Sequence, residues 1–73
     1  MSTRLPAVRP RQLIRTLERK GWELVRTRGS VFAHPDNPKL ITVPNHPGDL
    51  KRPLVAGILK DAGISRDEFL RLL

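Results

Sequence analysis

The chain has two histidines, His34 and His46, and no cysteine. Histidine gains and loses a proton near neutral pH more readily than other side chains, so both are candidates for proton transfer. His34 directly precedes Pro35, and the alternative for it is a turn residue that bonds to the backbone. His46 lies in a polar loop after Pro44, where the alternative is a structural or RNA-contacting role. Both histidines stay open as candidate catalytic groups.

Five basic side chains are candidates for binding phosphate groups. Arg26 and Arg28 are two residues apart on an expected strand, so both side chains leave the same face. Together with Lys20, Lys51 and Arg52 they could line a track for the backbone of a nucleic acid. The alternative is that they are ordinary solvated charges, as most Lys and Arg are. Because the positive charge is concentrated around this region, we interpret the five as residues that bind nucleic acid.

The sequence lacks the patterns of several other kinds of catalysis. No Asp/Glu cluster is spaced for magnesium, and there is neither a nucleophilic cysteine nor a Gly-x-Ser-x-Gly motif. We therefore expect no metal site and no cofactor.

Length and charge limit the class of protein. The 73 residues are too few to divide a hydrophobic core in two, so we expect one domain. The net charge is +7, and residues 1–28 hold eight Lys and Arg against two Asp and Glu. This imbalance favours a polyanion such as nucleic acid as the partner. No apolar run is long enough for a membrane span or a secretion signal, so we expect a cytoplasmic protein with no membrane contact.

Hydrophobic periodicity predicts a helix, three short strands and two further helices. Residues 1–8 show little pattern and predict a flexible N-terminal arm, which leaves residues 9–73 as the domain. The first helix is expected over residues 10–20, opened by Pro10 and ended by Gly21. Strands are expected at residues 22–28, 31–33 and 40–43, separated by turn signals. A second helix is expected at residues 53–62, and the capping pattern from Ser65 to Glu68 begins a short third helix.

This order predicts an α+β domain with helices packed on one face of a three-stranded antiparallel sheet. The aromatic residues Trp22 and Phe69 are expected in its core. The other expected core residues follow the helical stripes and the strand alternation: Leu13, Ile14, Leu17, Val25, Phe32, Ile41, Val43, Val55, Ile58 and Leu59.

In this order and spacing, five stretches of the chain resemble the HicA family of toxin endoribonucleases. They run from Leu13 to Trp22, from Arg28 to Ser30, from Phe32 to Pro35, from Val43 to His46 and from Ile58 to Ile64. The resemblance implies a fold like that of a double-stranded-RNA-binding domain, α-β-β-β-α with a short C-terminal helix. It also implies the toxin of a type II toxin–antitoxin system, a metal-independent mRNA interferase that a HicB-type antitoxin neutralises.

The chain departs from the family at the catalytic motif. The family has Gly-Ser-His, followed after two residues by an aromatic strand residue, whereas Gly29 and Ser30 are followed directly by Val31 and Phe32. Two residues, the histidine among them, are missing between Ser30 and Val31. Counting back from Phe32 puts Gly29 in the place of the histidine. A two-residue deletion preserves strand alternation, so we expect the sheet to persist and cleavage to be impaired.

Three functions stay open at this point. The first is the family's endoribonuclease, and the second is a non-catalytic module of the same fold that binds RNA or the antitoxin. The third is a small DNA-binding protein that reads bases with the helix at residues 53–62. The third is the weakest, because this helix offers only Lys60 as a cation and no Asn, Gln or Arg for base edges.

Overall fold

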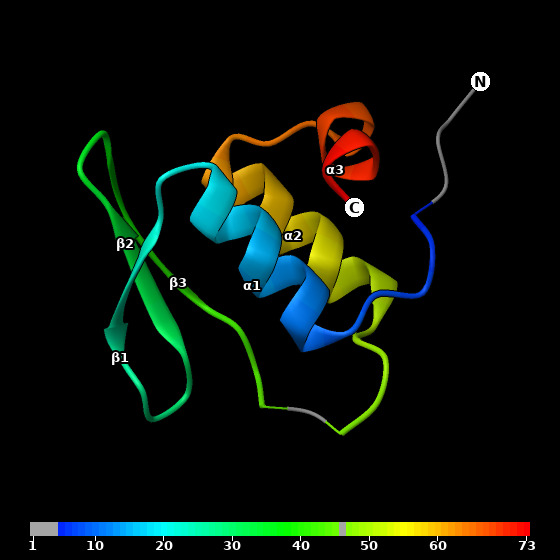
Figure 1. The fold of residues 1–73 in the computed structure, drawn as a ribbon, viewed down its shortest axis with the longest axis horizontal. Helices are drawn as coiled ribbons and strands as arrows, with labels where there is room; N and C mark the ends of the chain where they lie inside the picture. Colours follow the sequence, from blue (N-terminus) through cyan, green and yellow to red (C-terminus); the bar gives the residue numbers. More distant parts are fainter. Residues whose placement is uncertain (1–4, 46) are drawn as a thin grey trace.

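The computed structural model describes residues 5–45 and 47–73, and within them the helices and strands follow the expected order (Figure 1). The elements are α1 (Pro10–Arg19), β1 (Glu23–Arg26), β2 (Val31–His34), β3 (Asn37–Thr42), α2 (Arg52–Ala62) and α3 (Arg66–Leu72). The strands form one antiparallel sheet in the order β1-β2-β3, and α1 and α2 lie side by side on one of its faces. The expected α+β class and the α-β-β-β-α layout with a short C-terminal helix are confirmed.

Phe32 lies at the centre of the sheet and fixes its register. It is the middle strand's buried residue, 1% exposed, and it pairs with Leu24 of β1 and Ile41 of β3. Because side chains alternate between the two faces of a strand, a shift of one residue would turn Phe32 from the helices into solvent. The burial of this one ring therefore sets the pairing of both hairpins.

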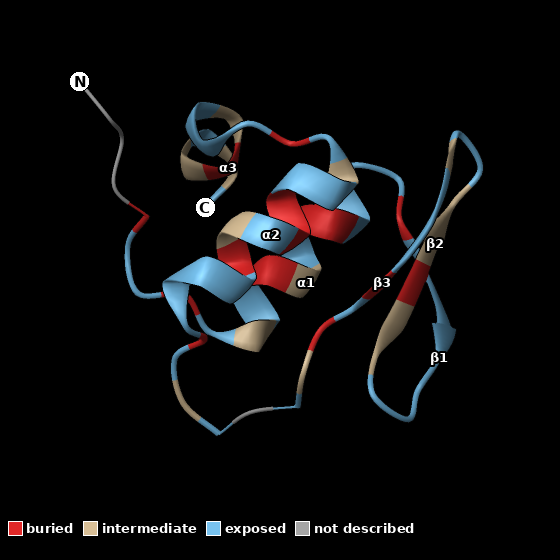
Figure 2. Cartoon of the chain, turned by 180° about the vertical axis from the view of Figure 1, so that it is seen from behind, coloured by how far each residue is buried: buried red, intermediate tan, exposed pale blue. Residues whose placement is uncertain are grey.

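Most of the expected core residues are buried, and Figure 2 shows them gathered along α1, α2 and the middle of β2. Trp22 and Phe69 are buried as expected, and Ile14 is only partly buried against the core. The sequence gives no periodic signal for Thr16, whose buried hydroxyl donates to the carbonyl of Gln12 at 3.2 Å. The other expected residues that are buried are Leu13, Leu17, Phe32, Ile41, Val43, Val55, Ile58 and Leu59.

The assignment of Val25 to the core is wrong, because its side chain is 53% exposed. β1 is an edge strand that is exposed along its whole length. Its pairing with β2 shifts register between Leu24 and Arg26, so Val25 is the extra residue of a β-bulge. A bulge bends the strand and re-aims its side chains, which breaks the alternation expected for this segment.

Two expected strand boundaries also need correction. β1 ends at Arg26 rather than at residue 28, because residues 27–30 form a turn. β3 begins at Asn37 rather than at Leu40, so Pro38 lies inside a strand. Proline has no N–H to donate, and it is tolerated here because β3 is the other edge of the sheet.

The segment before α1, for which the sequence predicts an arm over residues 1–8, contributes Leu5 and Val8 to the core. Val8 forms an isolated antiparallel bridge with Leu50, whose N–H donates to the Val8 carbonyl at 2.7 Å. This bridge holds together the two segments that lead into α1 and α2. A single bridge requires no regular spacing of apolar residues, which is why the sequence before α1 shows no hydrophobic periodicity.

Candidate nucleic-acid interface

The Gly29 and Ser30 remnant of the family motif forms the turn between β1 and β2. Both residues have positive φ, 83° at Gly29 and 45° at Ser30. The N–H of Ser30 donates to the carbonyl of Thr27 at 3.4 Å, and the N–H of Val43 donates to the carbonyl of Ser30 at 3.1 Å. A left-handed backbone costs a residue with a side chain about 1–2 kcal/mol, so Ser30 adopts it because the reversal is tight.

This turn occupies the place where the family resemblance leads us to expect a strand histidine. Phe32 is held in the core, so the two residues that are missing before Val31, relative to the family motif, are missing from the turn end of the hairpin. Gly29, three residues before Phe32, therefore lies in the turn rather than on β2. An added Cβ at Gly29 would meet no atom within 4 Å, but its φ of 83° disfavours any L side chain there.

His34 joins the end of α1 to the turn between β2 and β3. Its Nδ1 accepts the backbone N–H of Asp36 at 3.0 Å, and its Nε2 lies 3.0 Å from the carbonyl of Lys20. Because a carbonyl can only accept, this arrangement fits the tautomer in which Nε2 carries the proton. The ring also lies against Trp22, with centroids 5.3 Å apart. These contacts agree with the alternative of a residue that bonds to the backbone, although His34 is the last residue of β2 and not part of the turn itself.

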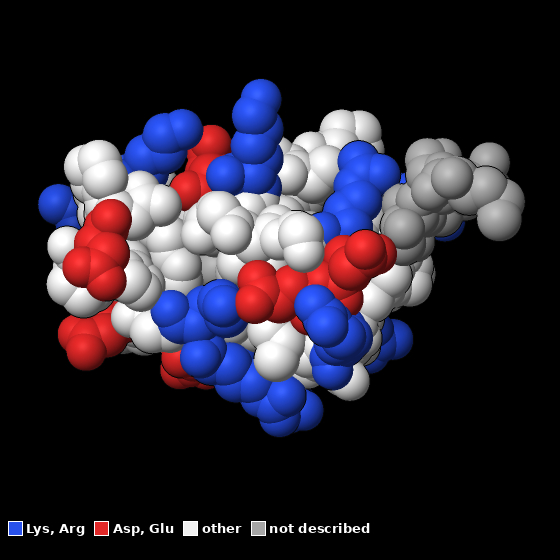
Figure 3. Space-filling view, turned by 90° about the horizontal axis from the view of Figure 1, so that it is seen from above, with Lys and Arg blue, Asp and Glu red and all other residues white. Residues whose placement is uncertain are grey.

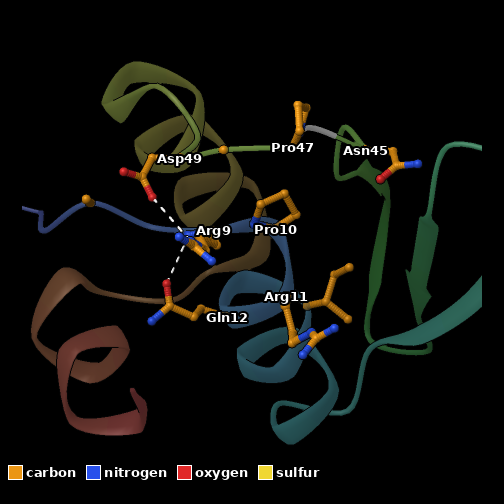
Figure 4. A pocket seen from close by; sticks show the side chains of 10 residues that line it. Arg9, Pro10, Arg11, Gln12, Asn45, Pro47 and Asp49 are labelled. Atoms are coloured by element: carbon orange, nitrogen blue, oxygen red, sulfur yellow. Dashed lines mark hydrogen bonds and ion pairs between the residues drawn. The ribbon is translucent and has the colours of Figure 1, made fainter.

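His46 lies outside the described residues. Its neighbours Asn45 and Pro47 border a hollow of about 890 Å³ at the start of α1 (Figure 4). Arg9 and Arg11 line the same hollow, and Nε of Arg9 lies 3.9 Å from a carboxylate oxygen of Asp49.

Sequence reasoning missed Arg9 and Arg11 as candidate phosphate contacts. The positive end of a helix dipole favours acidic residues, yet the first turn of α1 has none. Two arginines at this end are unfavourable next to the positive end of the helix dipole, and Asp49, which lies 3.9 Å from Arg9, offsets part of their charge in the hollow. Arginines in place of acidic residues at a helix start were the sequence feature that could have indicated a phosphate contact here.

Arg26 and Arg28 border a second, shallower hollow at the β1–β2 turn, together with Leu24, Val25 and Thr27. Arg28 lies in the turn, so the expectation that both side chains leave one face of a strand does not apply to it. Figure 1 shows this turn and the segment after β3 at the same end of the molecule as the start of α1. The two arginine-lined hollows therefore lie at one end of the fold.

The structure does not bring Lys20 to this end. Lys20 follows the last turn of α1, and its Nζ lies 2.7 Å from a carboxylate oxygen of Glu68 on α3. Figure 3, which views the molecule from above Figure 1, shows acidic side chains among the basic ones on that face. Lys51 and Arg52 lie at the start of α2, where Nε of Arg52 donates to the carbonyl of Leu5 at 3.1 Å. The five expected cations thus occupy three places.

Among the described residues, no group of three His, Asp or Glu side chains is placed to hold a metal ion. No helix in the same part of the chain is long and apolar enough to cross a membrane.

The fold is that of a small basic α+β domain, and comparison with known protein families identifies the family to which it belongs. Residues 10–64 match the family model described as the HicA toxin of bacterial toxin-antitoxin. The match covers more than half of the chain, which therefore belongs to the HicA toxin family and is a toxin of a toxin–antitoxin system. No curated protein matches the chain.

We expect His34→Ala to destabilise the fold without weakening RNA binding. The change removes two backbone hydrogen bonds and the contact with Trp22. The cost should be about 1–3 kcal/mol, as for other polar groups left unpaired, measured by urea denaturation. An unchanged midpoint, or a loss of RNA affinity at a temperature where the variant is folded, would show that His34 has another role.

Proposed function

We propose that this chain is a HicA-type toxin that binds RNA in the manner of an mRNA interferase but cleaves it poorly, and that a HicB-type antitoxin binds it. The observation that carries the proposal is the tight β1–β2 turn at Gly29 and Ser30, which leaves no strand position for the family histidine. A cytoplasmic location belongs to the same proposal, because the mRNA is there.

The chemistry of RNA cleavage explains why one missing side chain matters. The 2′-hydroxyl beside each phosphate supplies the nucleophile, so the protein needs only a group that moves protons and cations that stabilise the transition state. No metal ion is required for this reaction. Arg26, Arg28, Arg9 and Arg11 supply cations at one end of the fold.

The described residues supply no histidine for proton transfer at the end of the fold that holds the start of α1 and the β1–β2 turn. Both ring nitrogens of His34 are engaged with the backbone, next to the opposite end of α1. A positioned general acid or base contributes about 10²- to 10⁴-fold to the rate, and its loss should slow cleavage by a factor of that size. The alternative is a module with no turnover at all, which binds RNA or the antitoxin through the same surface.

Lengthening the hairpin should restore cleavage. We expect insertion of His-Ala between Ser30 and Val31 to raise the rate of RNA cleavage in EDTA by about 10²-fold or more. The two added residues extend β2 without changing which face Phe32 occupies. The readout is the cleavage of a labelled single-stranded RNA, with cell growth as a second measure.

Two matched controls separate the histidine from the hairpin length. Insertion of Ala-Ala at the same place should leave the rate low, because it lengthens the strand without an imidazole. His46→Ala in the unaltered chain should change little. Full activity of the unaltered chain that disappears in His46→Ala would make His46 the catalytic group and refute the proposal.

Removing Arg26 and Arg28 together should weaken RNA binding and its dependence on salt. Each phosphate contact to a single strand contributes about 0.7 to the slope of log K against log[salt], so the double alanine variant should flatten the slope by about 1 to 2. The matched control is Lys60→Ala with Arg71→Ala, which removes the same charge from α2 and α3. Equal slopes for the two double variants would identify Arg26 and Arg28 as ordinary surface charges.

A further inference from the structure

An apolar groove of about 310 Å³ runs between β3 and α2, on a different part of the molecule from the arginine-lined hollows. It is lined by Leu40 and Ile41 from the strand and by Leu54, Gly57 and Ile58 from the helix, among others. Leu40 is 65% exposed and Leu54 is 38% exposed, which makes them two of the most exposed large apolar residues described.

Gly57 is the second observation. It lies in the middle of α2, where glycine destabilises a helix relative to alanine. Its φ is not positive, and an added Cβ would meet no atom of the described residues within 4 Å. Neither the backbone conformation nor the packing in the described part of the chain therefore requires glycine there. What the missing side chain provides is a flat place on the helix, at which another molecule can approach the backbone closely.

The charge of the surroundings limits what this molecule can be. Three exposed lysines are close in sequence to the lining of the groove. Lys39 precedes Leu40, Lys60 precedes Asp61, and Lys51 is one helical turn before Leu54. The chain as a whole carries a net charge of +7. Two copies of such a chain repel each other, which argues against a second copy. A nucleic acid has no apolar side chain to place in the groove. An acidic protein segment with an apolar residue fits both the lining and the rim.

We propose that the antitoxin docks on this groove, placing an apolar side chain between Leu40 and Leu54 against Gly57, with acidic residues near the lysines. This inference rests on the proposed antitoxin partner. It adds a contact away from the RNA surface, so the antitoxin can hold the toxin without competing with RNA at every point. The ion pair between Lys39 and Asp61, 3.1 Å apart and half-exposed, marks one end of the docking surface.

The test measures binding of the purified HicB-type antitoxin of this system to variants of the full chain by isothermal titration calorimetry. Leu40→Ala and Gly57→Gln should each weaken the complex by about tenfold or more, as truncation or blocking of a central contact does. Leu73→Ala is the matched control, a leucine 50% exposed at the C-terminus and outside the groove, and it should leave the affinity unchanged. Gly57→Ala should raise the Tm of the free chain by about 4–8 °C, because alanine is the better helix former.

The outcomes distinguish this inference from the proposed function. If the unaltered chain binds the antitoxin and neither Leu40→Ala nor Gly57→Gln weakens the complex, the docking surface is refuted and the antitoxin partner stands. If the unaltered chain does not bind the antitoxin, both the partner and its docking surface are refuted. A Gly57→Ala variant of lower Tm would show that the fold itself requires glycine, which removes the argument for close approach.

Discussion

The burial of Phe32 is the constraint from which the rest of this account follows. The ring lies in the middle of the central strand, 1% exposed, and its pairing with Leu24 and Ile41 fixes the register on both sides. A loss of two residues before Val31 leaves the alternation of side chains unchanged, so Phe32 keeps its face and its pairing with Leu24 and Ile41. The loss therefore falls in the turn between β1 and β2, which is tight and has Ser30 in the left-handed region. In the proposed function, the same tight turn removes the catalytic position.

The two ends of the molecule differ in how their polar and charged side chains are used. At the end near Lys20, His34 and the Lys20–Glu68 ion pair connect α1 to the sheet and to α3, so polar groups there are used for structure. At the opposite end, Arg9 and Arg11 begin a helix at which cations are unfavourable, and Arg26 and Arg28 flank the shortened hairpin. Arg9 and Arg11 gain nothing from the helix dipole, and the proposed function assigns them to RNA. Gly57 is likewise a residue that costs helix stability, in the middle of α2.

The sequence predicted those parts of the structure in which local pattern and burial agree. The stripe of Leu13 and Leu17 in α1 and the capping pattern from Ser65 to Glu68 in α3 were expected, and the Ser65 Oγ accepts the N–H of Glu68 at 3.1 Å. The parts that sequence could not predict depend on contacts between distant residues. Val25 is a β-branched apolar residue of the kind found in core strands, but a bulge on an edge strand turns its side chain to solvent. Leu5 and Val8 enter the core through one bridge to Leu50, which leaves no periodic signal.

The candidate site divides in the same way. The backbone contacts of His34 agree with an alternative that the sequence offered, because the proline that follows it is a local signal. The sequence shows no histidine directly after Ser30, and the effect of this on cleavage stays a prediction. The dispersal of Lys20, Arg26 and Lys51 to three places could not be predicted, because sequence spacing carries no information on how α3 and the N-terminal segment pack. Arg9 and Arg11 were overlooked because a charge at a helix start gains meaning only once the hollow beside it is known.

The central claim is that this chain binds RNA and cleaves it poorly, because its hairpin closes where the catalytic group should stand. The most direct test is a single-turnover experiment in EDTA, with the unaltered chain in excess over a labelled single-stranded RNA and binding followed in the same samples. The account predicts that the RNA is bound and stays intact for far longer than binding takes. Complete cleavage on the timescale of binding would contradict this claim. The chain would then have a positioned proton-transfer group, either His46 or one of the described residues.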